Sequence, residues 1–486
     1  MYTATVAQIR EMEKNAVASG VPEYELMCRA GYQAAVWIEK LFPQAARLVF
    51  LCGGGNNGGD ALVAARYLSY RRCIIFSTRK KEQFHGCAAQ AAADLPENIP
   101  FVVREKLTVQ DFFNGDVIID GLLGIGFAGD RVRDNVASFI AAVNESKLPV
   151  VALDLPSGIN GDNGKAAENG AVNAAVTLTF GAPKAGLFCN GGAKLRGRLR
   201  VLDIGLQKSD AGEEVFTNCD AEKLIPRFDP DCHKNSRGRV LIWGGSAEYP
   251  GAAALCTQAA LKSGAGIVRC ASSADLRNRL CNAAIFRKLA CGETPENWFP
   301  HSDVLVAGCG WGSDVCAGHL KLAQNFEGNV IFDADALNGF ARDITLWKKR
   351  GNTLITPHPG EASRLLATLG EDVRESRKEN ALILAQKLAT VVLYKGRDTV
   401  IAEPAGRVLT VAAGSPLLAT AGSGDVLAGI IGALASQGVP LFEAAALGAY
   451  IHGIAGENAG FLPIADDLPL LASHVIGKLQ SGLNIV

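Results

Sequence analysis

The feature that most restricts the fold is an alternation of short apolar runs with helix-like segments. In the first half, runs rich in Val, Ile and Leu occur at Arg47–Cys52, Cys73–Phe76, Val117–Ile119, Val150–Leu153, Ala175–Thr179 and Leu199–Leu202. Continuous apolar runs of this length are typical of strands buried on both faces. Helix-like segments such as Ala61–Tyr70 and Asn135–Glu145 lie between them. Repeated strand–helix units predict a mostly parallel sheet wound on both sides.

A second series of the same kind follows a polar segment. Residues 207–232 contain Pro226 and Pro230 and show no clear strand, with a short helix expected at Ala221–Ile225. Further strands are predicted at Val240–Trp243, Ile267–Cys270, Val304–Ala307, Val330–Phe332, Thr353–Ile355, Val391–Tyr394 and Thr399–Ala402. Helices are predicted at Asp425–Ala435, Phe442–Ala459 and Leu468–Leu479. The chain is therefore expected to consist of two α/β domains and a linker, at residues 1–206, 225–486 and 207–224, respectively.

Composition excludes several classes of function. With 48% hydrophobic and 20% charged residues, the chain can fill packed cores. A formal net charge of −1 argues against a general nucleic-acid binder. The 13 cysteines show neither CxxC nor zinc-type spacing, which fits a reducing compartment. The N-terminus lacks a secretory apolar core, and Val426–Phe442 is too polar to cross a bilayer. We therefore expect a cytoplasmic protein with no nucleic-acid or membrane partner.

A glycine-rich loop, Gly53–Asp60, follows the first predicted strand and opens a helix. Glycines allow close approach of a ligand, and a helix N-terminus offers free N–H groups to a phosphate. The loop satisfies the GxGxxG spacing, but no carboxylate follows the next strand, as a dinucleotide-binding Rossmann unit requires. Its paired Asn residues and Asp60 suit a hard cation or ordered hydroxyls better. A glycine-rich turn without a ligand remains the alternative.

Two later strands of the first half also end in carboxylates. Asp120 follows Val117–Ile119, and Asp154, with Ser157 close behind it, follows Val150–Leu153. Ligands of open α/β sheets bind outside the carboxyl ends of the strands. These side chains and Asn57 are therefore expected to converge on one crevice. A single aspartate at a strand end can equally be a helix cap, so that alternative stays open for each one.

The motifs GGGNNGGD, DGLLGIG, DLPSG and TFGAPKAGL, in this order, resemble the YjeF N-terminal domain, the NAD(P)H-hydrate epimerase family. The resemblance covers about residues 1–205 and implies a Rossmann-like fold that interconverts the R and S forms of the hydrated nicotinamide ring. It implies Asp154 as a catalytic residue and potassium ligands at Asn57, Asp120 and Ser157. It implies substrate contacts from Asn56, Asn57, Gly58, Gly59, Asp60, Gly124, Ile125, Gly126, Phe127, Ala128, Gly129, Asp130 and Asp154.

The second half carries a further glycine turn, Gly422–Gly424, directly before Asp425 and an apolar helix. Backbone N–H groups there could hold a phosphoryl group, and Asp425 could accept a proton from an attacking hydroxyl. An aspartate that only caps the helix is the alternative. Other strand ends carry Asp333 with Asp335, His358 with Glu361, and Lys395–Thr399. Glu361 could order magnesium through water or simply favour the helix dipole.

The motifs HKNSRGRVLIWGGS, FDADALN, TPHPGEASRLL, VVLYKGRDTVIA and ATAGSGDVLAG resemble the ribokinase-like superfamily, and within it the YjeF C-terminal domain. That family is the ADP-dependent NAD(P)H-hydrate dehydratase, and the resemblance covers about residues 225–486. It implies phosphorylation of the ring hydroxyl and loss of phosphate, with Asp425 as the catalytic base. Implied substrate contacts are Ala253, Gly310, His358 and Asp425. Implied nucleotide contacts are Lys395, Gly396, Arg397, Asp398, Thr399 and Gly424.

One loop departs from the family pattern. The chain has Gly308-Cys-Gly-Trp-Gly312 where such families usually have GPGLG. Losing proline removes a fixed φ and leaves the loop around Gly310 free to take another shape. Trp311 is expected to be a packed aromatic residue rather than a stacking platform.

Together the two resemblances predict a bifunctional enzyme that repairs hydrated NADH and NADPH. Its expected cofactors are potassium and magnesium, with ADP as co-substrate, although preference for ADP or ATP stays open. We also expect a homo-oligomer. A small-molecule kinase, for example for a vitamin precursor or sugar, is one alternative, since the fold does not fix the substrate. A non-catalytic nucleotide- or RNA-binding first domain is another.

Overall fold

The computed structural model describes residues 1–207, 212–312 and 315–482. Two compact units are present: the first contains Met1–Glu214, and the second begins at Val215. The expectation that residues 207–232 contain no strand is wrong, because β8 (Glu214–Phe216) belongs to the second unit's sheet. The expected short helix is present as α7 (Asn218–Leu224). Of the predicted linker, residues 208–211 lie outside the described residues.

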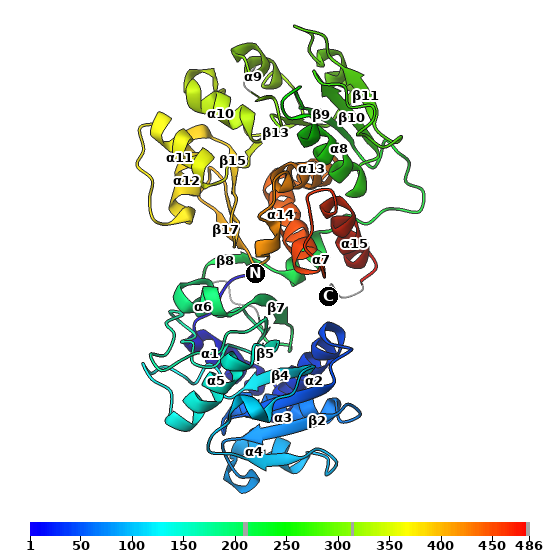
Figure 1. Ribbon diagram of the computed structural model, residues 1–486. Helices are drawn as coiled ribbons and strands as arrows, with labels where there is room; N and C mark the ends of the chain where they lie inside the picture. Colours follow the sequence, from blue (N-terminus) through cyan, green and yellow to red (C-terminus); the bar gives the residue numbers. More distant parts are fainter. Residues whose placement is uncertain (208–211, 313–314, 483–486) are drawn as a thin grey trace. The chain divides into compact units, whose positions relative to one another are not determined.

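The first unit is built on a parallel sheet in the order β3-β2-β1-β4-β5-β6-β7. The strands are β1 (Arg47–Cys52), β2 (Cys73–Ser77), β3 (Phe101–Val103), β4 (Asp116–Gly121), β5 (Val150–Leu153), β6 (Val176–Phe180) and β7 (Arg198–Leu202). The helices are α1 (Val6–Ala18), α2 (Glu23–Leu41), α3 (Asn56–Tyr67), α4 (Gly86–Ala93), α5 (Asp134–Ser146) and α6 (Asn190–Leu195) (Figure 1). This confirms the predicted doubly wound sheet. Only the short edge strand β3 was not predicted.

Alternate residues of β1 show why its sequence is apolar throughout. Phe50 packs into a core with α2 and α3, whereas its neighbours Val49 and Leu51 pack into a second core with α5. All three side chains are fully buried. A strand covered on both faces needs apolar side chains at every position.

The order of strands reverses at β1, which lies between β2 and β4. The loops after β1 and β4 therefore leave the same sheet edge side by side. Gly53 donates its N–H to the Gly121 carbonyl at 3.1 Å, and a Cβ on Gly53 would lie 1.9 Å from the Leu122 carbonyl oxygen. Only glycine allows this approach. The contact places the glycine-rich loop against the end of β4, at the switch point where such sheets bind ligands.

The second unit contains a larger mixed sheet, in the order β11-β10-β9-β12-β13-β14-β15-β16-β17-β8. Its further strands are β9 (Arg239–Trp243), β10 (Ile267–Ser272), β11 (Ile285–Lys288), β12 (Val304–Ala307), β13 (Asn329–Phe332), β14 (Thr353–Ile355), β15 (Val391–Tyr394), β16 (Val400–Ala402) and β17 (Val408–Val411). Pairing is parallel from β11 to β15 and antiparallel between β15, β16 and β17. The predicted strands are confirmed, and β11 and β17 are additional.

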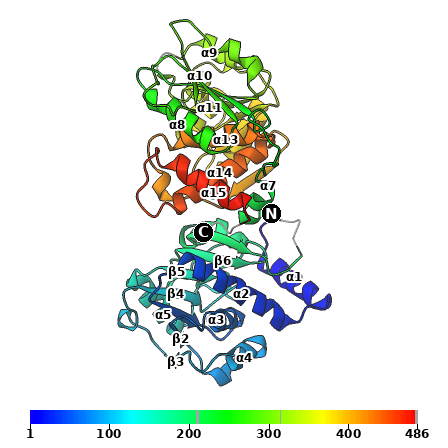
Figure 2. The same ribbon diagram turned by 90° about the vertical axis from the view of Figure 1, so that its right-hand side faces the viewer.

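Two layers of helices cover this sheet. The first consists of α8 (Pro250–Lys262), α13 (Ser423–Ser436), α14 (Leu441–Glu457) and α15 (Leu468–Gln480), which share one core. The second contains α9 (Ala317–Ala323), α10 (Asp335–Arg342), α11 (Pro359–Thr368) and α12 (Arg377–Leu388), which share another. The two views show both layers (Figures 1 and 2). Within the described ranges, no helix is long and apolar enough to cross a membrane.

Candidate active sites

A cavity of about 1500 Å³ opens at the switch point of the first unit. Most of the predicted substrate contacts line it, namely Asn56, Asn57, Asp60, Gly124, Ile125, Gly126, Phe127, Ala128, Gly129 and Asp154. Three predicted contacts do not line it. Gly58 and Gly59 pack against Gly53 and Met27, while Asp130 pairs with Lys165 at 2.7 Å on the exposed surface. The site thus draws on α1, the glycine-rich loop and the strand ends.

The three predicted potassium ligands gather around the Leu123 carbonyl oxygen. Asn57 Nδ2 donates to this oxygen at 2.8 Å, and Ser157 Oγ lies 3.2 Å from it. Ser157 Oγ also donates to Asp120 at 2.6 Å, and the Ser157 N–H donates to the other oxygen of Asp120 at 2.8 Å. Burial raises the pKa of Asp120 to about 6, although the Ser157 hydrogen bonds oppose the shift. Three of the predicted residues are thus brought together.

The Asn57 side chain gives a test of whether a cation fits here. Its Oδ1 atom is buried and has no hydrogen-bond partner among the described residues. A buried acceptor without a partner is costly unless something positive meets it. With the Asp120 carboxylate and the Leu123 carbonyl nearby, the donor set consists of oxygens, which suit a hard monovalent cation. The residues present therefore fit potassium.

Asp154 follows β5 in a strained conformation and holds a buried ion pair. Its φ of 63° lies in the left-handed region that non-glycine residues rarely adopt. The Lys184 ammonium, 1% exposed as a residue, binds the Asp154 carboxylate and donates to the Phe180 carbonyl at 2.7 Å. Sequence reasoning missed Lys184, although it stands in the quoted motif TFGAPKAGL. Strained aspartates held in this way are typical of functional sites.

Two further carboxyl groups face this ion pair from the cavity wall. Burial raises the pKa of Asp60, and the charge of Asp154 raises it further. Glu13, on α1, has a raised pKa for the same two reasons. Glu13 was not predicted, because the sequence of the N-terminal helix does not indicate which side of that helix faces the cavity. Glu13, Asp60 and Asp154 therefore place three carboxyl groups around the buried ammonium group of Lys184.

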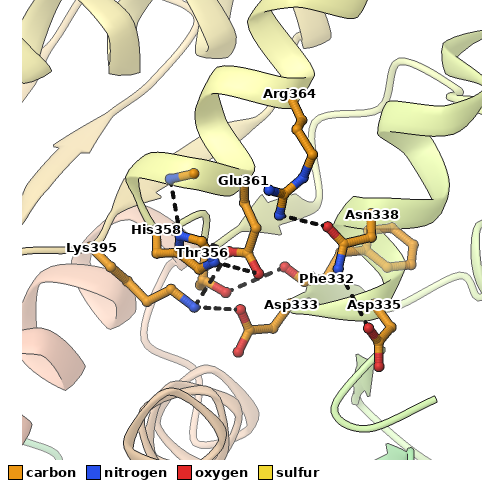
Figure 3. Close-up of polar contacts among 10 residues, drawn as sticks. Phe332, Asp333, Asp335, Asn338, Thr356, His358, Glu361, Arg364 and Lys395 are labelled. Carbon is orange, nitrogen blue, oxygen red and sulfur yellow. Dashed lines mark hydrogen bonds and ion pairs between the residues drawn. The ribbon is translucent and has the colours of Figure 1, made fainter. Parts of the chain in front are cut away.

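A second polar cluster occupies the carboxyl ends of β13, β14 and β15 in the second unit (Figure 3). Lys395 Nζ donates to Asp333 at 2.7 Å and lies 3.8 Å from Glu361. Glu361 accepts the His358 backbone N–H at 2.9 Å, so this pair caps α11. Burial raises the pKa of Glu361 to about 7 despite the nearby Lys395. Burial opposes the charge of Lys395, but Asp333 and Glu361 outweigh it and hold its pKa above the usual value.

Asp425 lies in the first turn of α13 and faces the same cluster. The helix begins at Ser423, two residues before the predicted start, and Gly422 precedes it with a φ of 88°. Burial and the charge of Asp333 raise the pKa of Asp425 to about 7. The Ser423 N–H donates to the Thr420 carbonyl at 3.3 Å, whereas the N–H groups of Gly424 and Asp425 precede the first bond within the helix, from Val426 to Gly422, and can meet an anion. Gly422 supplies the left-handed turn that exposes them.

The predicted nucleotide loop forms a tight turn between β15 and β16. Gly396 has a φ of 154° and Asp398 a φ of 53°, and Thr399 Oγ1 donates to the Gly396 carbonyl at 2.9 Å. Arg377, on α12, binds the Arg397 carbonyl. A Cβ on Gly424 would lie 3.3 Å from Lys395 Nζ, so the two predicted contacts are neighbours.

The loop Gly308–Gly312, which departs from the GPGLG pattern, has a left-handed backbone conformation at its three glycines. Gly308, Gly310 and Gly312 all have positive φ, between 69° and 111°. Cys309 replaces the proline, and its carbonyl accepts the Gly245 N–H at 2.8 Å. The loop is therefore tied to the loop after β9. Trp311 is 6% exposed and packs on Trp243, which confirms the packed reading.

Of the remaining predicted substrate contacts, Gly310 and Ala253 lie where these loops meet α8. A Cβ on Gly310 would lie 2.6 Å from the Tyr249 carbonyl oxygen. Ala253 is fully buried, and a Cβ on Gly245 would lie 3.1 Å from its methyl group. His358 is half exposed and at the edge of the cluster. Burial lowers the pKa of His358, as does the nearby Lys395.

Comparison with known proteins assigns both units. Residues 23–186 match the family model described as YjeF-related protein N-terminus. Residues 240–476 match the model described as NAD(P)H-hydrate dehydratase. Among solved structures, a ribokinase-like superfamily protein of Enterococcus faecalis V583 is similar with a TM-score of 0.49 and 24% identity, covering 56% of this chain and 99% of that one.

Curated relatives align with nearly the whole chain. The bifunctional NAD(P)H-hydrate repair enzyme of Coxiella burnetii is 36% identical over 470 residues, which cover 93% of each chain. The protein of the same name from Escherichia coli (strain K12) is 33% identical over 472 residues, which cover 92% of this chain and 88% of that one. With these identities across both units, the chain belongs to the family of bifunctional NAD(P)H-hydrate repair enzymes.

Proposed function

We propose that the first unit interconverts the R and S forms of hydrated NADH and NADPH, and that the second dehydrates the S form at the expense of ADP. The observation that carries this proposal is the presence of two separate enclosed aspartates. Asp154 and Asp425 each stand at the carboxyl end of their own sheet, beside a glycine-rich turn. The domain ranges 1–206 and 225–486 are proposed for the two activities.

In the first unit, epimerisation requires the ring hydroxyl to leave one face and return to the other. A proton must move with it in each direction, and Asp154 is placed to accept and return that proton. Lys184 compensates the charge of Asp154 and fixes its position through the Phe180 carbonyl. Asn57, Asp120 and Ser157 would hold the potassium ion, which when bound supplies a fixed positive charge in this part of the site.

In the second unit, the reaction transfers phosphate to the ring hydroxyl and then eliminates it. Asp425, whose pKa is about 7, can accept the hydroxyl proton near neutral pH. The N–H groups of Gly422–Gly424 can stabilise charge on the phosphoryl group in flight. Lys395 lies close enough to Gly424 to add a positive charge there. Glu361 is an oxygen ligand that would hold magnesium through water, and magnesium when bound neutralises nucleotide phosphates.

The test uses a mixture of R- and S-hydrated NADH with potassium, magnesium and either ADP or ATP. The proposal expects full recovery of reduced nicotinamide absorbance and release of one phosphate per molecule. The Asp154→Asn variant should recover the S form and leave the R form. A stable phosphoester without recovered absorbance would instead show a small-molecule kinase. Tight binding of the R form without turnover by the parent protein would show a non-catalytic first unit.

A further inference from the structure

The dehydratase site contains a thiol that the proposed reaction does not use. Cys309 is 1% exposed and lies in the loop after β12. Its Sγ atom, an oxygen of Asp333 and an oxygen of Asp425 all lie within 4.8 Å of one another. Asp333 follows β13 and Asp425 is in α13, so three separate segments bring three potential ligand atoms to one point.

The charge balance of this pocket favours a divalent cation. The carboxyl groups of Asp333, Glu361 and Asp425 share one ammonium group, that of Lys395. The nearby Asp335 and Arg364 add one charge of each sign, so with every group ionised four negative charges stand against two positive ones, a net charge of −2. A dication placed among them would offset it.

We propose that Cys309, Asp333 and Asp425 form a binding site for a thiophilic divalent cation, Zn²⁺, and that its binding inhibits the dehydratase. One sulfur and two carboxylate oxygens are the three-ligand set of a zinc site with an open fourth position. Tetrahedral zinc holds such atoms roughly 3.4–3.7 Å apart, so the side chains must close by about 1 Å. Magnesium does not compete for the sulfur, because it binds oxygen ligands.

Neighbouring side chains contact two of the three ligands: Cys256 hydrogen-bonds Cys309, and Lys395 contacts Asp333. Lys395 binds Oδ1 of Asp333, while a Cβ on Gly424 would lie 3.7 Å from Oδ2. Because Gly424 has no side chain, the second oxygen can turn to a metal without losing the lysine. Formation of the zinc–sulfur bond releases the Cys309 thiol proton to solvent. Asp425 bound to zinc can no longer accept the substrate proton, which is why inhibition follows.

The inhibition rests on the function proposed for the second unit, but the binding does not, so the experiment measures both. A full-length background variant replaces the exposed cysteines, Cys232, Cys281, Cys291 and Cys316, with serine. Titration with Co²⁺ reads binding through the sulfur-to-cobalt charge-transfer band, and Zn²⁺ then displaces the cobalt. We expect one cobalt per chain. Zinc should inhibit dehydration while epimerisation in the first unit continues.

Cys309→Ser and, should serine disturb the loop, Cys309→Ala should abolish the charge-transfer band. Either should raise the zinc concentration for half-inhibition at least tenfold. The matched control is Cys52→Ser, which removes a fully buried thiol from the first unit and should change neither reading. Asp333→Asn should weaken cobalt binding without removing the band.

An unchanged band and unchanged inhibition in both Cys309 variants would overturn the site. A chain that binds cobalt through Cys309 but has no dehydratase activity would keep the metal site and overturn the proposed function. Active enzyme that zinc inhibits equally with and without Cys309 would overturn the inhibitory role of the site.

Discussion

The two units place an aspartate at the same kind of position but surround it differently. In the first, Asp154 is bound directly by a buried ammonium group, that of Lys184. In the second, the lysine of the site, Lys395, binds Asp333 instead, and Asp425 has a pKa of about 7. The directly bound ammonium group holds the Asp154 carboxylate in place, whereas burial without a directly bound cation raises the pKa of Asp425 into the neutral range.

This comparison separates two kinds of chemistry on similar sheets. An ion pair suits a site that must position a carboxylate against a returning hydroxyl. A pKa near 7 suits a base that must take a proton fully from a hydroxyl during phosphoryl transfer. The fold alone does not decide between them. We expect the side chains that contact each aspartate to determine which chemistry it supports.

The greatest loss of activity is expected from removing the proposed base of the second unit. Asp425→Asn should lower the rate of dehydration by about 10²–10⁴-fold, since proton transfer at the hydroxyl loses its acceptor. Epimerisation in the first unit should be unchanged and serves as the internal control. Phosphate release and recovery of nicotinamide absorbance measure the first rate, and chiral separation of the hydrates measures the second. Dehydration within twofold of the parent rate would remove Asp425 from the mechanism.

The same substitution also tests the cause of the raised pKa. A raised acid pKa means that Asp425 favours folding below its unfolded pKa of about 3.9, and that this contribution is lost as the pH rises through about 7. Asn cannot ionise, so Asp425→Asn should stabilise the second unit at pH 8 by roughly 1–3 kcal/mol. Urea unfolding at pH 8 and pH 5 measures the difference. Equal effects at both pH values would contradict burial of a charge.

In the first unit, breaking the ion pair should cost both stability and rate. Lys184→Met leaves the Asp154 carboxylate enclosed without its cation, which costs about 3–5 kcal/mol for a buried pair. Epimerisation should fall by about 10²-fold or more, because the carboxylate loses its position. Chemical denaturation and the rate of interconversion are the measurements.

The double variant Asp154→Asn with Lys184→Met provides the control for this result. It removes both charges, so it should recover most of the lost stability without recovering epimerisation. Recovery of epimerisation in this double variant would show that Lys184 serves only folding and that Asp154 has no chemical role.

The pH dependence of the two activities should differ in a defined direction. Below a pH of about 7, Asp425 is increasingly protonated, so the dehydration rate should fall about tenfold per pH unit. The base is ionised above that pH, and the rate should level off. The rate of epimerisation should not change with a midpoint near pH 7, because Asp425 belongs to the other unit. The residual dehydration rate of the Asp425→Asn variant should not show this midpoint either. A dehydration rate that is flat from pH 5 to pH 8 would contradict the assignment.

Much of this arrangement could be predicted from the sequence, and the reason is local. Strands such as β5 are buried on both faces, so they can be predicted from their continuous apolar runs. The carboxylates that follow these strands indicate the edge of the sheet at which a ligand would bind. The prediction that Asn57 and Ser157 lie close together followed from the rule that ligands bind outside the carboxyl ends of the strands. The short, partly exposed strands β3 and β11 carry no such pattern and were missed.

What escaped prediction depends on contacts between distant segments. Lys184 meets Asp154 across 30 positions, and Glu13 reaches the cavity from the first helix. Lysine and glutamate are mostly exposed in proteins, so the sequence alone predicts a solvent-exposed side chain at both positions. Similarly, β8 in the predicted linker is recognisable only through its place at the edge of the second sheet.

A substitution at Trp311 should change the least, and it tests whether an aromatic ring also takes part in the second site. Trp311 packs on Trp243 with ring centroids 5.2 Å apart, and its indole N–H is buried without a partner among the described residues. Trp311→Phe keeps an apolar ring and removes that costly N–H, so stability should change by less than about 1 kcal/mol. Dehydration should stay within about twofold, with KM unchanged. A tenfold rise in KM at unchanged kcat would mean that the ring binds substrate, because lost uniform binding raises KM alone. The second site would then depend on stacking as well as on its carboxylates.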